Sequence, residues 1–285
     1  LVHSASNTYL AFEQNAIRDI AKDLSGLANG VEPQLFRYGV NVRFFTPDTT
    51  PPIVNYYNVS IADRSINFVF DKVISCTSTK VDYIKLQNAK FLGSSNLFYS
   101  LTPASSYYLC NPLQDNVKQV QVVIGLDDLQ VIQAYESLMK TKEETWLILL
   151  TGAFTDVNGI ATLGIADDFA LPVYHFIGDT VRPILLSFTI VRVSAVMTLT
   201  FSKPLAVDTL DITRLIFQNF IPCPNSLNPT CDPDVAPYSN SPTYIPLSQS
   251  IYLSTDALKM NIDIELGQDF TDIYGLNTLG IFKQQ

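Results

Sequence analysis

The sequence is poor in several residue types, and each shortage excludes a class of protein. Charged residues make up only 16% of the 285 residues and hydrophobic residues 47%, so the chain is too apolar to be disordered. Glycine occurs only 12 times, which excludes collagen and glycine-rich linkers. No apolar run reaches the roughly 18 residues of a membrane-spanning helix. We therefore expect a globular chain without a membrane span.

Basic residues and histidine are also scarce. The 18 Lys and Arg stand against 27 Asp and Glu, and the net charge of −9 argues against a nucleic-acid partner. The two histidines, His3 and His175, lie in no catalytic motif, and the chain has no phosphate-binding loop, nucleophile elbow or zinc-protease motif. The sequence predicts a protein that is not an enzyme and carries no cofactor.

An internal repeat organises the chain. The residues from Asp48 (DTTPPIVNYYNVSIADRSINFVFDKV) resemble those from Asp179 (DTVRPILLSFTIVRVSAVMTLTFSKPL) at an offset of 131 residues. Repeats of this kind indicate a chain of similar structural units. The identities include Pro52 with Pro183, Ile53 with Ile184, Phe70 with Phe201 and Lys72 with Lys203.

The other parts of the unit repeat as well. Residues 7–20 resemble residues 144–157, and residues 127–138 resemble residues 268–279. The prediction is three parts: the C-terminal part of one repeat (1–47), a complete repeat (48–178) and most of a further repeat (179–285). The chain begins without methionine or a signal peptide, so we expect a segment of a longer protein.

Strand patterns dominate each unit. Residues 64–70, 195–201 and 258–266 alternate with period two, which predicts half-buried strands, whereas residues 146–150 are apolar throughout and predict a central strand. Many short strands in about 131 residues favour an antiparallel β-sandwich. The proline-rich residues 46–52 predict a short, stiff linker.

One segment has helical periodicity. Leu129, Ile132 and Tyr135 recur on one face of residues 128–138, and either Asp127 or Asp128 is a candidate N-cap. Residues 269–274 repeat the pattern. We therefore expect one short helix in each unit.

These motifs resemble a known family. The DTTPP start, the TFSKP segment at residues 200–204 and the AIRDI and AFTDV ends are similar to tandem immunoglobulin-like repeats of bacterial S-layer-type proteins and of very large surface, matrix or flagellar-hair (mastigoneme-like) proteins. The equivalent of TFSKP in the preceding repeat departs from the pattern, with Asp71 for Ser and Val73 for Pro. The resemblance implies tandem Ig-like antiparallel β-sandwiches, an extracellular or cell-surface location and a structural role.

Four cysteines are candidates for disulfides. Cys223 and Cys231 flank a proline- and asparagine-rich loop that a disulfide would close, and Cys76 and Cys110 lie within one unit. The alternative is four free thiols. Zinc is disfavoured, because no C-x-x-C pair and no neighbouring histidine is present.

Two further patterns have both a functional and an ordinary interpretation. Asn58-Val59-Ser60 is a glycosylation sequon, or a chance match. The acidic groups are candidate calcium ligands, but their spacing fits no calcium loop, so we favour helix capping and solvation and predict no metal. These groups are Asp127-Asp128, Asp167-Asp168 and Asp232 with Asp234.

Two functions remain open. The favoured one is a structural segment of a long extracellular filament or coat, whose partners are neighbouring repeats and copies of itself in a fibre. The alternative is an adhesin whose inserts at 89–117 and 220–250 bind a glycan or a protein. Tyrosine pairs at 56–57 and 107–108 are candidate contacts between domains.

Overall fold

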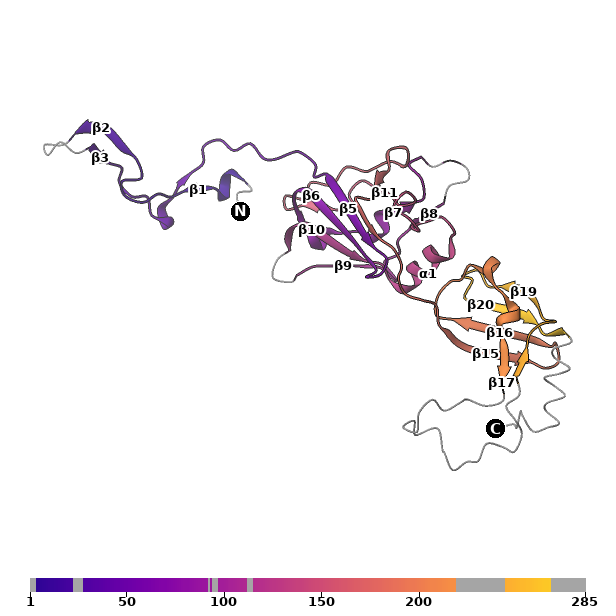
Figure 1. The fold of residues 1–285 in the computed structure, drawn as a ribbon. Coiled ribbons are helices and arrows are strands. Elements are labelled where there is room, and N and C mark those ends of the chain that lie inside the picture. Colours follow the sequence, from indigo (N-terminus) through magenta and orange to yellow (C-terminus); the bar gives the residue numbers. More distant parts are fainter. Residues whose placement is uncertain are drawn as a thin grey trace, which may run out of the picture.

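The chain is all-β, as the sequence predicts. The computed structural model describes residues 4–22, 28–91, 93, 97–111, 115–218 and 244–267. These residues form short strands in several small sheets with one α-helix, α1 (Leu126–Ala134). Figure 1 shows three parts, which we call the arm (residues 4–47), the central unit (48–178) and the C-terminal unit (179–267). Short 3-10 helices occur at Ala5–Asn7, Phe36–Tyr38, Cys76–Ser78, Val81–Tyr83, Asp167–Phe169, Val207–Thr209 and Ile212–Arg214.

The central unit contains two sheets. The large sheet has the order β14-β5-β6-β10-β9, and β12 pairs with the far end of β6. Its strands are β5 (Val54–Ser60), β6 (Ser65–Ser75), β9 (Tyr107–Leu109), β10 (Asn116–Val123), β12 (Thr155–Asp156) and β14 (His175–Ile177). The small sheet has the order β13-β11-β7-β8. Its strands are β7 (Ile84–Gln87), β8 (Phe98–Ser100), β11 (Trp146–Leu149) and β13 (Leu171–Pro172). All pairs are antiparallel except β14 with β5.

Both sheets of the central unit contribute to one hydrophobic core. The large sheet supplies Tyr57, Phe68 and Phe70, and the small sheet supplies Leu86 and Leu147, all of them buried. Side chains of a strand alternate between its two faces, so the apolar alternation in the sequence directs every second residue into this core. The core is therefore built from strands that lie far apart in the sequence.

The described residues of the C-terminal unit repeat four strands of the large sheet. The order is β15-β16-β20-β19, and a separate pair joins β17 to β18. The strands are β15 (Leu185–Val191), β16 (Val196–Phe201), β17 (Ile216–Gln218), β18 (Tyr244–Pro246), β19 (Ile251–Thr255) and β20 (Asn261–Glu265). A smaller core contains Met197, Leu199, Ile262, Ile264 and Leu266.

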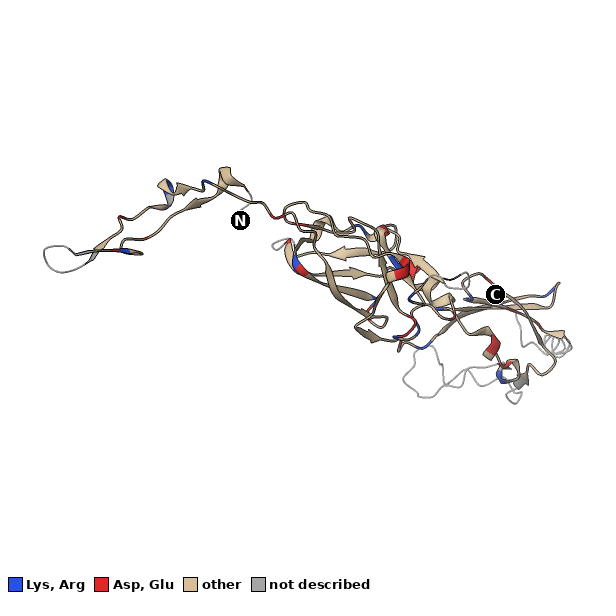
Figure 2. Ribbon diagram, turned by 90° about the horizontal axis from the view of Figure 1, so that it is seen from above, with Lys and Arg blue, Asp and Glu red and all other residues tan. Residues whose placement is uncertain are grey.

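The arm consists of two short strand pairs. These are β1 (Tyr9–Leu10) with β4 (Val40–Asn41) and β2 (Arg18–Lys22) with β3 (Ala28–Gly30). Most of its apolar side chains are exposed, including Leu10 at 65% and Ile17 at 73%. Figure 2 shows that acidic and basic positions are spread along its ribbon. The arm thus presents apolar surface that no described core covers.

Several backbone features recur in both units at the offset seen in the sequence. β15 begins and ends 131 residues after β5, and the 3-10 helices at Val207–Thr209 and Ile212–Arg214 follow Cys76–Ser78 and Val81–Tyr83 by the same interval. The tight turns between the first two strands match as well, because Arg64 and Ala195 both have φ of 54°. Left-handed backbone is uncommon for residues other than glycine, so the shared value marks an equivalent turn.

The arm repeats the end of the central unit. Phe12 and Gln34 exchange backbone hydrogen bonds, as Leu149 and Ile165 do, and each pair forms an isolated bridge. The turn after each bridge contains a residue with positive φ, Asn15 at 63° in the arm and Gly152 at 81° in the central unit. The arm therefore has the hydrogen-bonding pattern of residues 145–173.

Several details differ from the sequence predictions. The predicted strand 258–266 is too long: β20 begins at Asn261, because Lys259 turns the chain with φ of 55°. The predicted helix 128–138 is shifted to residues 126–134, which leaves Tyr135 beyond its end. Capping by Asp127 or Asp128 is wrong, because Gly125 is the N-cap and no side chain caps the helix.

Two surface predictions also need correction. Tyr57 is not available for domain contacts, because it is fully buried and its hydroxyl donates to the carbonyl of Thr145. Tyr107 is half exposed. The insert at 89–117 is not a free loop, since it contains β8 and β9. Most of the insert at 220–250 lies outside the described residues.

Candidate interface between units

A carboxylate and a lysine fasten the start of the central unit. Asp48 accepts hydrogen bonds from the backbone N–H of Thr50 at 2.9 Å and from its hydroxyl at 2.6 Å. Lys72, on β6, forms an ion pair with Asp48 and donates to the carbonyl of Thr50 at 2.6 Å. We call this arrangement the entry clamp. It ties the proline-rich linker to the large sheet.

The same clamp occurs at the start of the C-terminal unit. Asp179 accepts from the backbone N–H of Val181 at 2.9 Å, and Lys203 pairs with Asp179 and donates to the carbonyl of Val181 at 2.7 Å. The aspartate and the lysine are 24 residues apart in both copies. The recurrence of Lys72 as Lys203 was visible in the sequence, but its ion pair was not.

The entry clamp should lower the pH at which Asp48 takes up a proton. Hydrogen bonds from Lys72 and Thr50 hold the pKa of Asp48 well below its usual range. A carboxyl group with a lowered pKa stabilises the fold above its unfolded pKa of about 3.9, and this stabilisation is lost as the pH falls through the folded pKa. We expect Lys72→Met to raise the Asp48 midpoint by at least about one pH unit, measured by carbon NMR of the carboxyl group.

The second clamp provides the control for this measurement. Lys203→Met removes the equivalent lysine from Asp179 and should leave the Asp48 midpoint unchanged. An Asp48 midpoint that is the same with and without Lys72 would contradict the clamp.

The C-terminal end of α1 meets the second clamp. Gln133 donates to Asp179 at 2.8 Å, and Glu136 pairs with Lys259 of the C-terminal unit at 3.1 Å. Lys140 donates to the carbonyl of Gln133 at 2.8 Å, where a cation also complements the helix dipole. The helix thus joins the core of the central unit to the first residues of the next unit.

Lys140 is exposed as a residue, but its ammonium group donates to the carbonyls of Ile132 and Gln133 at this junction. The partial desolvation of that group lowers its pKa, while Asp179 and Glu144 act in the opposite direction. The exposed pair Glu136–Lys259 contributes little by itself, because surface ion pairs are worth about 0–1 kcal/mol. The junction therefore depends more on the clamp and the helix end than on that pair.

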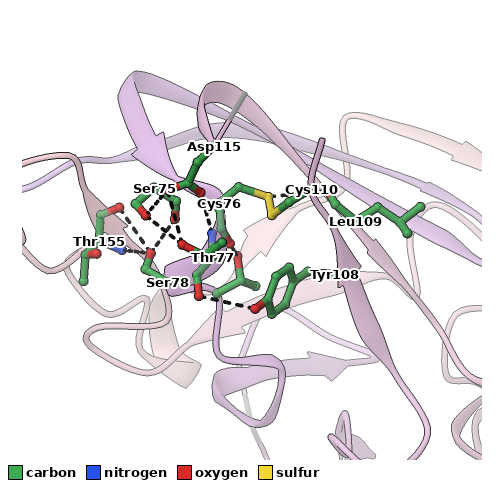
Figure 3. The surroundings of a disulfide bond; sticks show 10 residues. Ser75, Cys76, Thr77, Ser78, Tyr108, Leu109, Cys110, Asp115 and Thr155 are labelled. Carbon is green, nitrogen blue, oxygen red and sulfur yellow. Dashed lines mark hydrogen bonds between the residues drawn. A yellow bond between two sulfur atoms is a disulfide. The ribbon is translucent and has the colours of Figure 1, made fainter. Parts of the chain in front are cut away.

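Two of the four cysteines are joined by a disulfide. Cys76 and Cys110 form a disulfide with 5.8 Å between their Cα atoms (Figure 3). It ties the end of β6 to the residue after β9, and Asp115 supports the loop by accepting from the backbone N–H of Thr77 at 2.8 Å. That hydrogen bond lowers the pKa of Asp115. Cys223 and Cys231 lie outside the described residues.

Removing the disulfide should weaken the central unit. The bridge spans a sequence separation of 34 residues, and losing a bridge that closes a loop of this size costs about 4 kcal/mol, mainly through the entropy of the unfolded chain. We expect the double variant Cys76→Ser, Cys110→Ser to lose that amount in urea unfolding. A reducing agent should cause a similar loss in the unmodified chain and none in the variant. An unfolding curve insensitive to reduction would contradict this expectation.

The sequon and the acidic groups lie in different settings. Asn58 is on β5 between β6 and β14, and its buried Oδ1 has no hydrogen-bond partner among the described residues. Glycosylation there stays a prediction. Asp128 is buried against hydroxyl groups, whereas Asp127, Asp167 and Asp168 are exposed. Asp232 and Asp234 lie outside the described residues.

Two searches of the described residues gave negative results. No three His, Cys, Asp or Glu side chains in this part of the chain gather as a metal site requires. Within the same residues, no helix has the length and apolarity to cross a bilayer. Figure 2 shows basic positions scattered along the ribbon rather than gathered on one element.

The comparisons with known proteins found no match. No family model, no curated protein and no solved structure matches the chain. The likeness to Ig-like repeats therefore stays a prediction from the sequence motifs.

Proposed function

We propose that the chain is a structural, non-enzymatic segment of a long extracellular filament or surface coat, built of tandem Ig-like β-sandwiches that assemble through contacts between units. The observation that carries this proposal is the duplicated entry clamp, Asp48 with Lys72 and Asp179 with Lys203. Because the same clamp forms at the start of each unit, successive units begin in the same way. Units with similar ends that join head to tail produce linear assemblies.

The role of the polar groups supports a structural function. Asp48, Asp115 and Asp156 each accept backbone hydrogen bonds that hold turns or loop ends. Asp128 accepts from hydroxyl groups and from one backbone N–H beside α1. These carboxylates are engaged in maintaining the fold, which is the use expected of them in a scaffold.

The disulfide supports an extracellular location. Disulfides persist in oxidising compartments and are rare in the cytosol. The bond between Cys76 and Cys110 connects strand ends inside one unit, so it strengthens that unit against unfolding. Resistance to unfolding suits a protein of a cell surface or an external fibre.

Self-association tests the proposed function. Sedimentation velocity over a hundredfold range of concentration should show oligomers that grow with concentration, and negative-stain micrographs of the largest species should show linear chains. A chain that stays monomeric over this range, or that binds a glycan array as a monomer, would contradict a filament role and favour the adhesin.

A further inference from the structure

Two tyrosines from distant parts of the sequence lie ring against ring at the surface of the central unit. Tyr56 is on β5 and Tyr174 directly precedes β14, and their ring centroids are 4.9 Å apart with 43° between the ring planes. Paired aromatic rings in proteins lie about 4.5–7 Å apart, so these two rings are in close contact. Within the described residues, no other ring contact joins two tyrosines.

The strand backbone fixes the position of both rings. Side chains alternate along β5, so Tyr57 lies in the core and Tyr56 points to the opposite face. β14 runs parallel to β5 through the pair His175↔Asn58. The backbone N–H of Tyr174 donates to the carbonyl of Tyr57 at 2.9 Å. Both tyrosines are therefore attached to paired strands, which limits the motion of one ring relative to the other.

The pair is accessible to reagents from the solvent. Tyr174 is 66% exposed and Tyr56 is partly exposed. Tyr57 is the internal contrast, because it is fully buried and its hydroxyl donates to the carbonyl of Thr145. A reagent in solution can thus reach Tyr174 and the ring beside it, but not the neighbouring tyrosine in the sequence.

The fold of the unit does not require an aromatic residue at this place. Ser187 occupies the position of Tyr56 in the equivalent strand β15, at the same register against the next strand. Cys76 of the disulfide likewise has Val207 at the equivalent position of the C-terminal unit. The tyrosine, like the cysteine, is therefore an addition to the shared pattern of the repeat.

We propose that Tyr56 and Tyr174 form an oxidative cross-linking site, where hydrogen peroxide and a peroxidase join the two rings as dityrosine. This inference goes beyond the proposed function and does not require the chain to form filaments. The disulfide of the same unit favours an oxidising compartment, and hydrogen peroxide with a peroxidase is the one-electron oxidant that the reaction needs.

The reaction consumes one hydrogen peroxide for each cross-link. Each phenol loses one electron and one proton, which leaves a neutral phenoxyl radical whose unpaired electron is shared with the ring carbons beside the hydroxyl-bearing carbon. The two radicals combine at such carbons to form a carbon–carbon bond. The hydrogen on each joined carbon then moves as a proton to the oxygen of its ring, which restores both phenols. The protein loses two hydrogen atoms in total, and hydrogen peroxide is reduced to two water molecules.

Proximity determines which tyrosines react. Groups held in contact have an effective concentration far above that of groups on separate chains, so a radical on Tyr174 should couple with Tyr56 before it meets another chain. The new bond would close a loop that contains most of the central unit, including the disulfide between Cys76 and Cys110. A bond across so long a loop restricts the unfolded chain and thereby stabilises the folded unit.

Peptide mapping of the oxidised full chain tests the site. The chain is treated with hydrogen peroxide and a haem peroxidase, its disulfides are reduced, and the monomer fraction is digested. We expect the dominant dityrosine to join the peptides of Tyr56 and Tyr174, with a yield per chain that is unchanged on about tenfold dilution. A monomer fraction without this peptide pair, or with another tyrosine pair in excess, would overturn the proposal.

Phenylalanine variants provide matched controls. Tyr56→Phe and Tyr174→Phe keep the ring but lack the hydroxyl from which the radical forms, so each should lower dityrosine in the monomer fraction at least about tenfold. Tyr38→Phe should change it less than about twofold, because Tyr38 is 72% exposed but has no ring contact with a tyrosine in the described part of the chain. Equal yields in Tyr56→Phe and Tyr38→Phe would show that exposure alone determines the reaction, and would overturn the paired site.

Discussion

Replacing Phe154 by alanine is expected to lower the free energy of unfolding of the central unit by about 4 kcal/mol. Phe154 is fully buried, and its ring lies 5.2 Å from that of Phe68 and 4.9 Å from that of Phe70. The substitution removes both aromatic contacts and leaves a cavity between strands that come from distant parts of the sequence.

Urea unfolding followed by tryptophan fluorescence measures this loss, because Trp146 is the only tryptophan and lies on β11 of the same unit. The matched control is Phe169→Ala, since Phe169 is 77% exposed and its truncation should cost less than about 0.5 kcal/mol. A loss below about 1 kcal/mol for Phe154→Ala would mean that Phe154 does not pack in the core against Phe68 and Phe70.

The sequence predicted the positions of β6 and β16 well, because period-two alternation and burial coincide in these strands. β6 and β16 both begin within one residue of their predicted starts, and the offset of 131 residues recurs in strands, turns and 3-10 helices. These features depend on local backbone preferences and on which face of a strand is apolar. Both can be read without knowing which strands pair.

Features that depend on long-range contacts were not accessible in this way. Tyr57 looked like a surface tyrosine, yet it is buried, because carbonyl groups of Leu171 on β13 and of Thr145 before β11 accept from its hydroxyl across separations of 114 and 88 residues. The exposed state of Leu10 and Ile17 could not be foreseen either, since the same pattern is buried in the central unit. Periodicity shows which face of a strand is apolar, but not which residues cover that face.

Replacing Asp128 by alanine should cost about 4 kcal/mol, although aspartate at the start of a helix looked like an ordinary surface cap. Its side chain is 1% exposed and accepts from the hydroxyls of Tyr99 and Thr102, each at 2.7 Å, from the hydroxyl of Ser106 and from the backbone N–H of Thr102 at 2.9 Å. Hydrogen bonds to a charged group are worth about 1.5–3 kcal/mol each and are not additive.

The burial of Tyr99 and its bond to Asp128 both raise the pKa of the tyrosine. Asp128→Ala therefore removes the acceptor of several buried donors, whereas Asp127→Ala on the exposed side of the same turn should cost about 0.5 kcal/mol through the helix dipole. Urea unfolding again provides the measurement. Equal losses for the two aspartates would show that Asp128 acts only through the helix dipole.

Asp128→Asn separates the charge from the geometry. The amide keeps one oxygen for the N–H of Thr102, while its NH2 group faces hydroxyls that can rotate to accept, so we expect a loss of about 2 kcal/mol, half that of alanine.

The position also bears on the assembly, because α1 begins beside Asp128 and ends at the clamp of the next unit. If the network fixes the helix, Asp128→Ala should also weaken the contact between Gln133 and Asp179, which would appear as faster amide hydrogen exchange at Val181. Exchange unchanged at Val181 despite a large loss of stability would show that the helix start and the unit junction are energetically independent.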